Sequence, residues 1–168
     1  MLRRSSIIAS VLVIISLGAL GLFYASSKSP SPAKTTRGIS PTEKATAATS
    51  YLTAYNRYVA GPSSRDISLI NSRIPADEAR GISAYESSLQ SFSNALVGVE
   101  VPPADQADFK AVVAATNVWI GALDYLRSNV NTTVPAWNAA MDKVNAAQTT
   151  FNAKDAVLSN DLGITVNN

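Results

Sequence analysis

The sequence predicts an all-α protein that consists of an N-terminal transmembrane helix, a flexible linker and an up-down four-helix bundle. Three observations predict this fold. An uncharged apolar segment lies near the N-terminus, a stretch rich in serine and proline follows it, and the rest of the chain repeats its apolar positions every three or four residues. The expected parts are a cytoplasmic N-terminus, a membrane segment, a linker, the bundle and a tail, at residues 1–6, 7–24, 25–40, 41–163 and 164–168.

The membrane segment is predicted at residues 7–24, which carry no charged side chain. A helix of this length spans about 27 Å, close to the ~30 Å hydrocarbon core of a bilayer. Arg3 and Arg4 precede the segment and favour a cytoplasmic N-terminus, which places the body outside the cytoplasm. We therefore expect a single-pass protein of the cell membrane, with lipid as a partner of this segment. The alternative is a signal peptide that is cut after Gly21 or Ser27, which would give a secreted protein.

The linker, residues 25–40, is rich in Ser, Pro, Lys and Thr and has almost no large apolar side chains. Such a composition cannot bury enough surface to offset the entropy of ordering the chain. The residues up to Arg37 hold five basic and no acidic side chains, whereas the rest holds nine basic and twelve acidic ones. The basic charge therefore flanks the membrane segment, and we expect no nucleic-acid partner.

The first bundle helix is predicted over residues 41–60. Ser40 can cap this helix, Glu43 completes a capping box, and Gly61 ends the helix. Its apolar positions are Ala48, Tyr51, Leu52, Tyr55, Tyr58 and Val59. A short helix is expected within residues 66–74, where Ser63 and Asp66 give a weaker start signal and Pro75 forces a break.

Three longer helices are predicted in the remainder. The first starts at Pro75 and carries apolar residues up to Val99. Pro103 can open the next one, which is expected to run to about Val130. Thr133 can cap the last helix, and Gly163 ends it. Because short connections join these helices, they are expected to pack as antiparallel neighbours in a bundle.

The layout of an apolar segment, a Ser/Pro tether and a helical body resembles uncharacterised bacterial membrane-anchored or exported helical-bundle proteins. The residues that carry this resemblance are "VEVPPADQADF" between two long helices and "NDLGI" at the end of the last one, and the likeness covers about residues 75–165. It implies a bacterial exported bundle. It assigns no activity and no binding residue.

Catalytic and metal-binding residues are not predicted. The chain has no cysteine and no histidine, which excludes thiolate nucleophiles, imidazole bases and the commonest metal ligands. The acids Asp77, Glu78, Asp105 and Asp108 lie near helix starts, where carboxylates usually compensate the helix dipole. We therefore expect no enzyme, no metal and no cofactor.

Aromatic residues at helical spacing give the one candidate binding site. Tyrosine and tryptophan rings with a few polar groups can line a pocket for a small apolar or cationic ligand. The candidate lining residues are Tyr51, Tyr55, Trp119, Trp137, Thr116 and Gln148. The alternative is that the rings form the core, the Thr116 hydroxyl bonds to the preceding helical turn, Gln148 reaches water, and the apolar seam frays at Asp155.

These expectations combine into two functional hypotheses. The first is a membrane-tethered extracytoplasmic bundle with a structural or protein-interaction role, whose partner is a protein of the cell envelope. The alternative is a bundle of a sensory type that binds a small ligand through the aromatic residues. An enzyme ranks third, because no catalytic set of residues is present in the sequence.

Overall fold

The computed structural model describes residues 40–164 except Ala60 and Arg73, so the predicted membrane segment, most of the linker and most of the tail lie outside the described residues. Every regular element of the described part is a helix, and this part contains no strand, which confirms the all-α prediction. The five helices are α1 (Pro41–Val59), α2 (Ser64–Ile70), α3 (Pro75–Leu96), α4 (Gln106–Arg127) and α5 (Val134–Asp161). None of these helices is long and apolar enough to cross a membrane.

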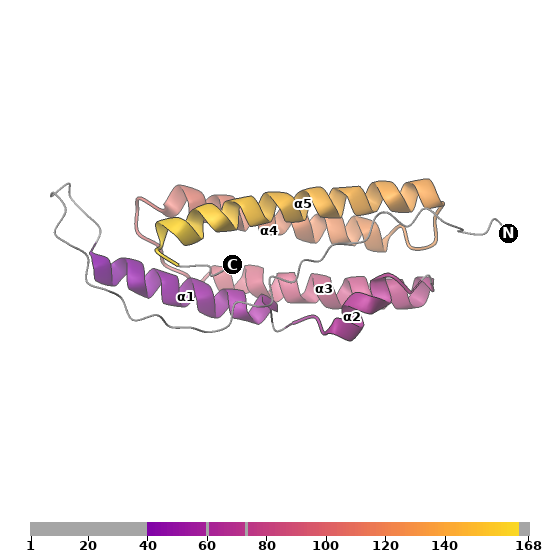
Figure 1. The fold of residues 1–168 in the computed structure, drawn as a ribbon, viewed down its shortest axis with the longest axis horizontal. Coiled ribbons are helices and arrows are strands. Elements are labelled where there is room, and N and C mark those ends of the chain that lie inside the picture. The colour runs from indigo at the N-terminus through magenta and orange to yellow at the C-terminus, as the bar shows by residue number, and fades with distance from the viewer. Residues whose placement is uncertain (1–39, 60, 73, 165–168) are drawn as a thin grey trace.

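The long helices lie lengthwise beside one another and reverse direction from one to the next along the chain (Figure 1). The start of α1, the connection between α3 and α4 and the end of α5 lie at one end of the bundle, and the connection between α4 and α5 lies at the other. The short helix α2 packs against the N-terminal half of α3, beyond the end of α1. The described residues therefore form an elongated helical bundle.

Helix α1 begins with the predicted cap. The backbone N–H of Ser40 donates to the Glu43 carboxylate (3.0 Å), and the Ser40 hydroxyl accepts from the N–H of Thr42 (3.3 Å). Near the C-terminus of α1, the buried hydroxyl of Ser88 in α3 donates to the carbonyl of Tyr58 (2.8 Å). Both ends of α1 thus have partners for some of the backbone groups that a helix leaves unpaired.

Helix α4 begins at Gln106, three residues later than the sequence predicts, and ends at Arg127 rather than near Val130. At its start, the N–H of Asp105 donates to the carbonyl of Pro102 (2.9 Å), so Pro103 lies in a turn instead of opening the helix. The valines on either side of α4 pack in the core although they lie outside a helix. Val99, Val101 and Val130 are all buried, and the connections therefore contribute to the core.

Helix α5 ends as predicted at a glycine. Gly163 has a positive φ of 74°, a conformation that a residue without Cβ adopts readily. The N–H of Gly163 donates to the backbone carbonyl of Asn160 (3.0 Å), and the N–H of Ile164 donates to that of Ser159 (2.8 Å). This pair of hydrogen bonds defines a Schellman motif, and Ile164 packs against the core beyond it.

Candidate functional site

The structure brings together some of the predicted pocket residues. Tyr51, Tyr55 and Trp119 are buried, with exposed fractions of 1%, 8% and 1%, and they belong to one group of contacting rings. Gln148 and Thr116 are buried as well. Trp137 is half-buried near the start of α5, packs against the core and makes none of these ring contacts.

The group of contacting rings, which we call the aromatic cluster, joins all four long helices. Ring centroids lie 5.3–6.4 Å apart, and most pairs meet edge to face. Its members are Tyr51, Tyr55, Tyr58, Tyr85, Phe92, Trp119 and Phe151. Four of them are absent from the predicted pocket lining, although their spacing of three and four residues already places them on the apolar seams: Tyr58, Tyr85, Phe92 and Phe151.

The aromatic cluster contains polar groups that point inward. The hydroxyl of Tyr51 donates to the Asp155 carboxylate, and the hydroxyls of Tyr58 and Tyr85 share a hydrogen bond of 2.8 Å. The Thr116 hydroxyl donates to the carbonyl of Val112 (2.9 Å), as expected for a threonine that bonds to the preceding helical turn. The indole N–H of Trp119 is buried and has no acceptor among the described residues. The cluster is therefore a core with several polar atoms rather than a purely apolar one.

Asp155 lies within α5, and the apolar seam continues beyond it instead of fraying there, because Leu158 and Leu162 are buried. Burial raises the pKa of the Asp155 carboxyl, and the hydrogen bond from Tyr51 opposes this rise. Burial, followed by the charge of Asp155, also raises the pKa of Tyr51 and that of Tyr55 far above the ordinary value, so both hydroxyls stay protonated. No lysine or arginine among the described residues forms an ion pair with Asp155.

We expect the substitution Asp155→Asn to increase stability at neutral pH. A raised carboxyl pKa in the folded state favours folding below the ordinary value of about 3.9, and this contribution is lost as the pH rises through the folded pKa. Asparagine cannot ionise and keeps an oxygen for the Tyr51 hydroxyl. Urea unfolding of residues 38–168 at pH 4 and pH 7 measures the effect. The variant should lose less stability than the natural protein between these values.

The matched variant Tyr51→Phe should change the pH dependence in the opposite direction. It removes the hydrogen bond that stabilises the ionised carboxylate, so the folded pKa of Asp155 rises further. Stability should then fall more steeply as the pH increases. Equal pH profiles for the natural protein and both variants would show that Asp155 is not desolvated.

Lys44 joins three segments at the end of the bundle where α1 starts. Its ammonium group donates to the Asp161 carbonyl at the end of α5 (2.8 Å) and lies 3.9 Å from the carboxylate of Asp105. The Asp105 side chain is only 7% exposed, and one of its oxygens has no hydrogen bond within the described part of the chain. Lys44 therefore partly balances a buried charge.

The four candidate acids do not form a common site. Asp77 pairs with Arg80 (3.1 Å), and Glu78 is buried beside it at the start of α3. Asp105 and Asp108 lie at the start of α4, which is at the other end of the bundle (Figure 1). Within the described part of the chain, no cluster of three acids suited to a metal ion is present.

Each of the four long helices contains a segment without charged side chains. Residues 45–56 of α1, 87–96 of α3, 111–123 of α4 and 144–153 of α5 contain no Asp, Glu, Lys or Arg. These segments lie at the same level, because Tyr55 contacts Phe92, Phe92 contacts Phe151, and Phe151 contacts Trp119. We call the exposed surface of these four segments the uncharged belt.

Threonines of the uncharged belt donate their hydroxyl hydrogens within their own helices. Thr46, Thr49 and Thr53 in α1 each donate to a carbonyl one turn earlier, at 2.8–2.9 Å. Thr149 and Thr150 in α5 do the same, each at 2.9 Å. A shallow depression of about 290 Å³ lies over the threonine face of α1. Covering these hydroxyls therefore leaves no donor without an acceptor.

Comparison of the chain with protein-family models, with curated proteins and with solved structures finds no match. A functional proposal for this chain thus depends on its own residues. The aromatic cluster and the uncharged belt are the two features that distinguish it.

Proposed function

We propose that the protein is a membrane-tethered extracytoplasmic helical bundle that acts by binding other proteins of the cell envelope. The observation that carries this proposal is the uncharged belt, which passes over four helices between two charged ends. The centres of protein interfaces are depleted of charged side chains, because burying an unpaired charge costs several kcal/mol. A belt of this kind can be covered without that cost.

The interior favours a structural or interaction role over chemistry. The rings of the aromatic cluster contact one another, and the acids lie at separate ends of the bundle. The hydroxyls of the belt threonines already donate hydrogen bonds within their own helices. A partner can therefore cover them without leaving a donor unpaired. The outer surface, rather than the interior, is therefore the proposed working part.

We also propose that the N-terminal part of the chain tethers the bundle to the membrane. The apolar residues 7–24 are long enough to cross a bilayer, and the linker that follows leads into α1. Because α1 starts at the end of the bundle that holds the α3–α4 connection, this end would face the membrane (Figure 1). The uncharged belt would then stand away from the lipid and be open to partners from the side.

Site-specific crosslinking in intact cells tests this function. A photo-reactive amino acid is placed in the full chain at exposed positions of the belt, namely Thr49, Gln90 and Asn152, and at exposed charged positions outside it, namely Arg80 and Glu100. We expect the products to be in the membrane fraction and the belt positions to capture envelope proteins in discrete bands. The two charged positions serve as matched controls and should capture little.

Two results would count against the proposed function. Equal capture at belt and control positions would mean that the belt is not a specific surface. Recovery of the intact chain in the cytosol would remove the membrane tether.

A specific observation supports a second candidate, a bundle that binds a small organic cation. Asp155 has no cationic partner among the described residues and lies beside the aromatic cluster, and carboxylates with aromatic rings are typical of ammonium recognition. Thermal unfolding with a panel of small amines distinguishes the two candidates. A ligand at 100 times its Kd adds about 2.7 kcal/mol to the stability, whereas an interaction module shows no shift.

A further inference from the structure

Helix α4 carries an apolar strip that begins in the uncharged belt and ends just beyond it at Tyr125, with all of its members except the half-buried Ala111 exposed. Ala111, Ala114, Val118, Gly121 and Tyr125 follow one another at spacings of three and four residues, so they share one side of α4. We call these five residues the α4 strip. Val118 is 62% exposed and Tyr125 is 43% exposed. Together with the small residues beside them, these two exposed side chains form an apolar surface suited to contact.

Among the described residues, no close contact requires a glycine at residue 121. A Cβ atom added there would meet nothing within 4 Å, and the residue lies in the interior of a helix. Glycine at such a position costs about 1 kcal/mol relative to alanine. Its missing side chain lowers the surface between Val118 and Tyr125, which lets another backbone approach closely.

The shape of the α4 strip suits an antiparallel copy of itself. Its N-terminal half is small, with two alanines, and its C-terminal half ends in the large ring of Tyr125. When two copies pack antiparallel about Val118, Tyr125 of each copy lies over Ala111 of the other. A parallel arrangement would instead place the two tyrosine rings against each other and leave a gap between the alanines.

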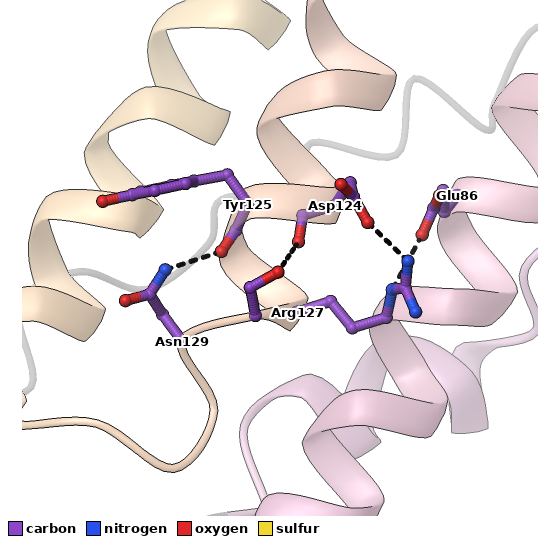
Figure 2. Close-up of polar contacts among 6 residues, drawn as sticks. Glu86, Asp124, Tyr125, Arg127 and Asn129 are labelled. Atoms are coloured by element: carbon purple, nitrogen blue, oxygen red, sulfur yellow. Dashed lines mark hydrogen bonds and ion pairs between the residues drawn. The ribbon is translucent and has the colours of Figure 1, made fainter.

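The charges beside the α4 strip select the same arrangement. Lys110 and Asp124 lie along the same border of the strip, one at each end, and both are exposed. The Asp124 carboxylate pairs with Arg127, which also pairs with Glu86 on α3 (Figure 2). The Asp124 side chain remains 58% exposed. In an antiparallel pair, Lys110 of each copy lies near Asp124 of the other, which gives two attractive pairs. In a parallel two-fold pair this border would face the opposite border of the other copy, so neither attractive pair would form.

Tyr125 contacts a cation on α5. Its ring points away from the side of α4 where Arg127 meets Glu86 (Figure 2), and the ammonium group of Lys143 in α5 lies 4.0 Å from the ring centroid. The carbonyl of Tyr125 accepts from the Asn129 side chain (2.7 Å), which secures the end of α4. A ring that already has a neighbour in its own chain loses less entropy when a partner covers it.

We infer that the α4 strip binds a second copy of this chain, with the two α4 helices antiparallel and a two-fold axis close to Val118. This inference rests on the proposed function and names one partner for the uncharged belt. Residues that lie at a two-fold axis contact their own counterparts in the other copy. Val118 of one chain should therefore lie beside Val118 of the other.

A cysteine placed on the axis tests this arrangement directly, because the natural chain contains no cysteine. The full chain with Val118→Cys is purified in detergent and treated with a short bifunctional maleimide. Thr53→Cys in α1 and Asn152→Cys in α5 are matched controls, because both residues are exposed belt positions outside the α4 strip. We expect a covalent dimer for Val118→Cys at low protein concentration and almost none for the controls.

A charge exchange tests the direction of packing. Adding Lys110→Glu to the Val118→Cys chain should weaken association roughly tenfold, since two attractive pairs become repulsive, and adding Asp124→Lys as well should restore it. Dimer yields that are equal at all three cysteine positions, or absent at residue 118, would overturn the α4 interface. The proposed function would remain intact in that case if the belt positions still captured other envelope proteins in cells.

Discussion

Replacing Phe92 with alanine is expected to lower the free energy of unfolding by about 3–5 kcal/mol. Phe92 is fully buried, and its ring contacts Tyr51, Tyr55 and Tyr58 of α1 and Phe151 of α5. Its removal leaves a cavity that the surrounding rings cannot fill, because each of them is held by its other neighbours. The loss should therefore exceed the hydrophobic transfer energy of the side chain alone.

Urea unfolding of residues 38–168, followed by circular dichroism, measures this effect. Gln90→Ala is the matched control, because Gln90 lies on the same helix and is exposed, and its replacement should change the stability by less than about 0.5 kcal/mol. A loss near 1 kcal/mol for Phe92→Ala would mean that α1 is not packed on α3 and α5 through the aromatic cluster.

Much of the helical fold could be predicted because its causes are local. Ser40 with Glu43 marks the start of α1, and Gly163 marks the end of α5, since each forms hydrogen bonds with residues close in sequence. The start of α4 was predicted three residues too early because that prediction, too, used only a local signal. Pro103 satisfies the local rule for a first helical residue, but the preceding turn and the burial of Val101 decide where the helix starts.

The candidate site could be predicted only in part, because its contacts join distant residues. Tyr51 and Asp155 were each notable in the sequence, yet nothing local indicates that they bond across 104 positions of the chain. The same holds for Lys44, whose partner Asp161 is 117 positions away. The uncharged belt is visible in the sequence as four separate segments, and only the packing of the helices shows that they lie at one level.

We expect Gly81→Ala to destabilise the protein by about 1–3 kcal/mol although alanine favours a helix. A Cβ atom at residue 81 would lie 2.5 Å from the carbonyl oxygen of Asp66 and 2.9 Å from the backbone nitrogen of Ile70. Both atoms belong to the backbone of α2, so relief requires α2 to move away from α3. Loss of this packing outweighs the gain in helix propensity.

Gly121→Ala is the matched control for Gly81→Ala, because it makes the same chemical change in a helix interior where the added atom meets nothing within 4 Å. At concentrations where residues 38–168 are monomeric, this variant should gain up to about 1 kcal/mol of stability. The two glycines should therefore shift the urea midpoint in opposite directions. A gain for both variants would mean that α2 does not pack closely on α3.

The Gly121 variant also separates folding from association. If the α4 strip binds a second copy of the chain, the added methyl group lies in the interface and holds the two helices further apart. The variant should then be more stable as a monomer and yet give less Val118 crosslinking than the natural sequence at the same concentration. A glycine that costs folding energy and improves a contact is consistent with a surface shaped for a partner, whereas an increase in both stability and crosslinking would contradict a close approach at this position.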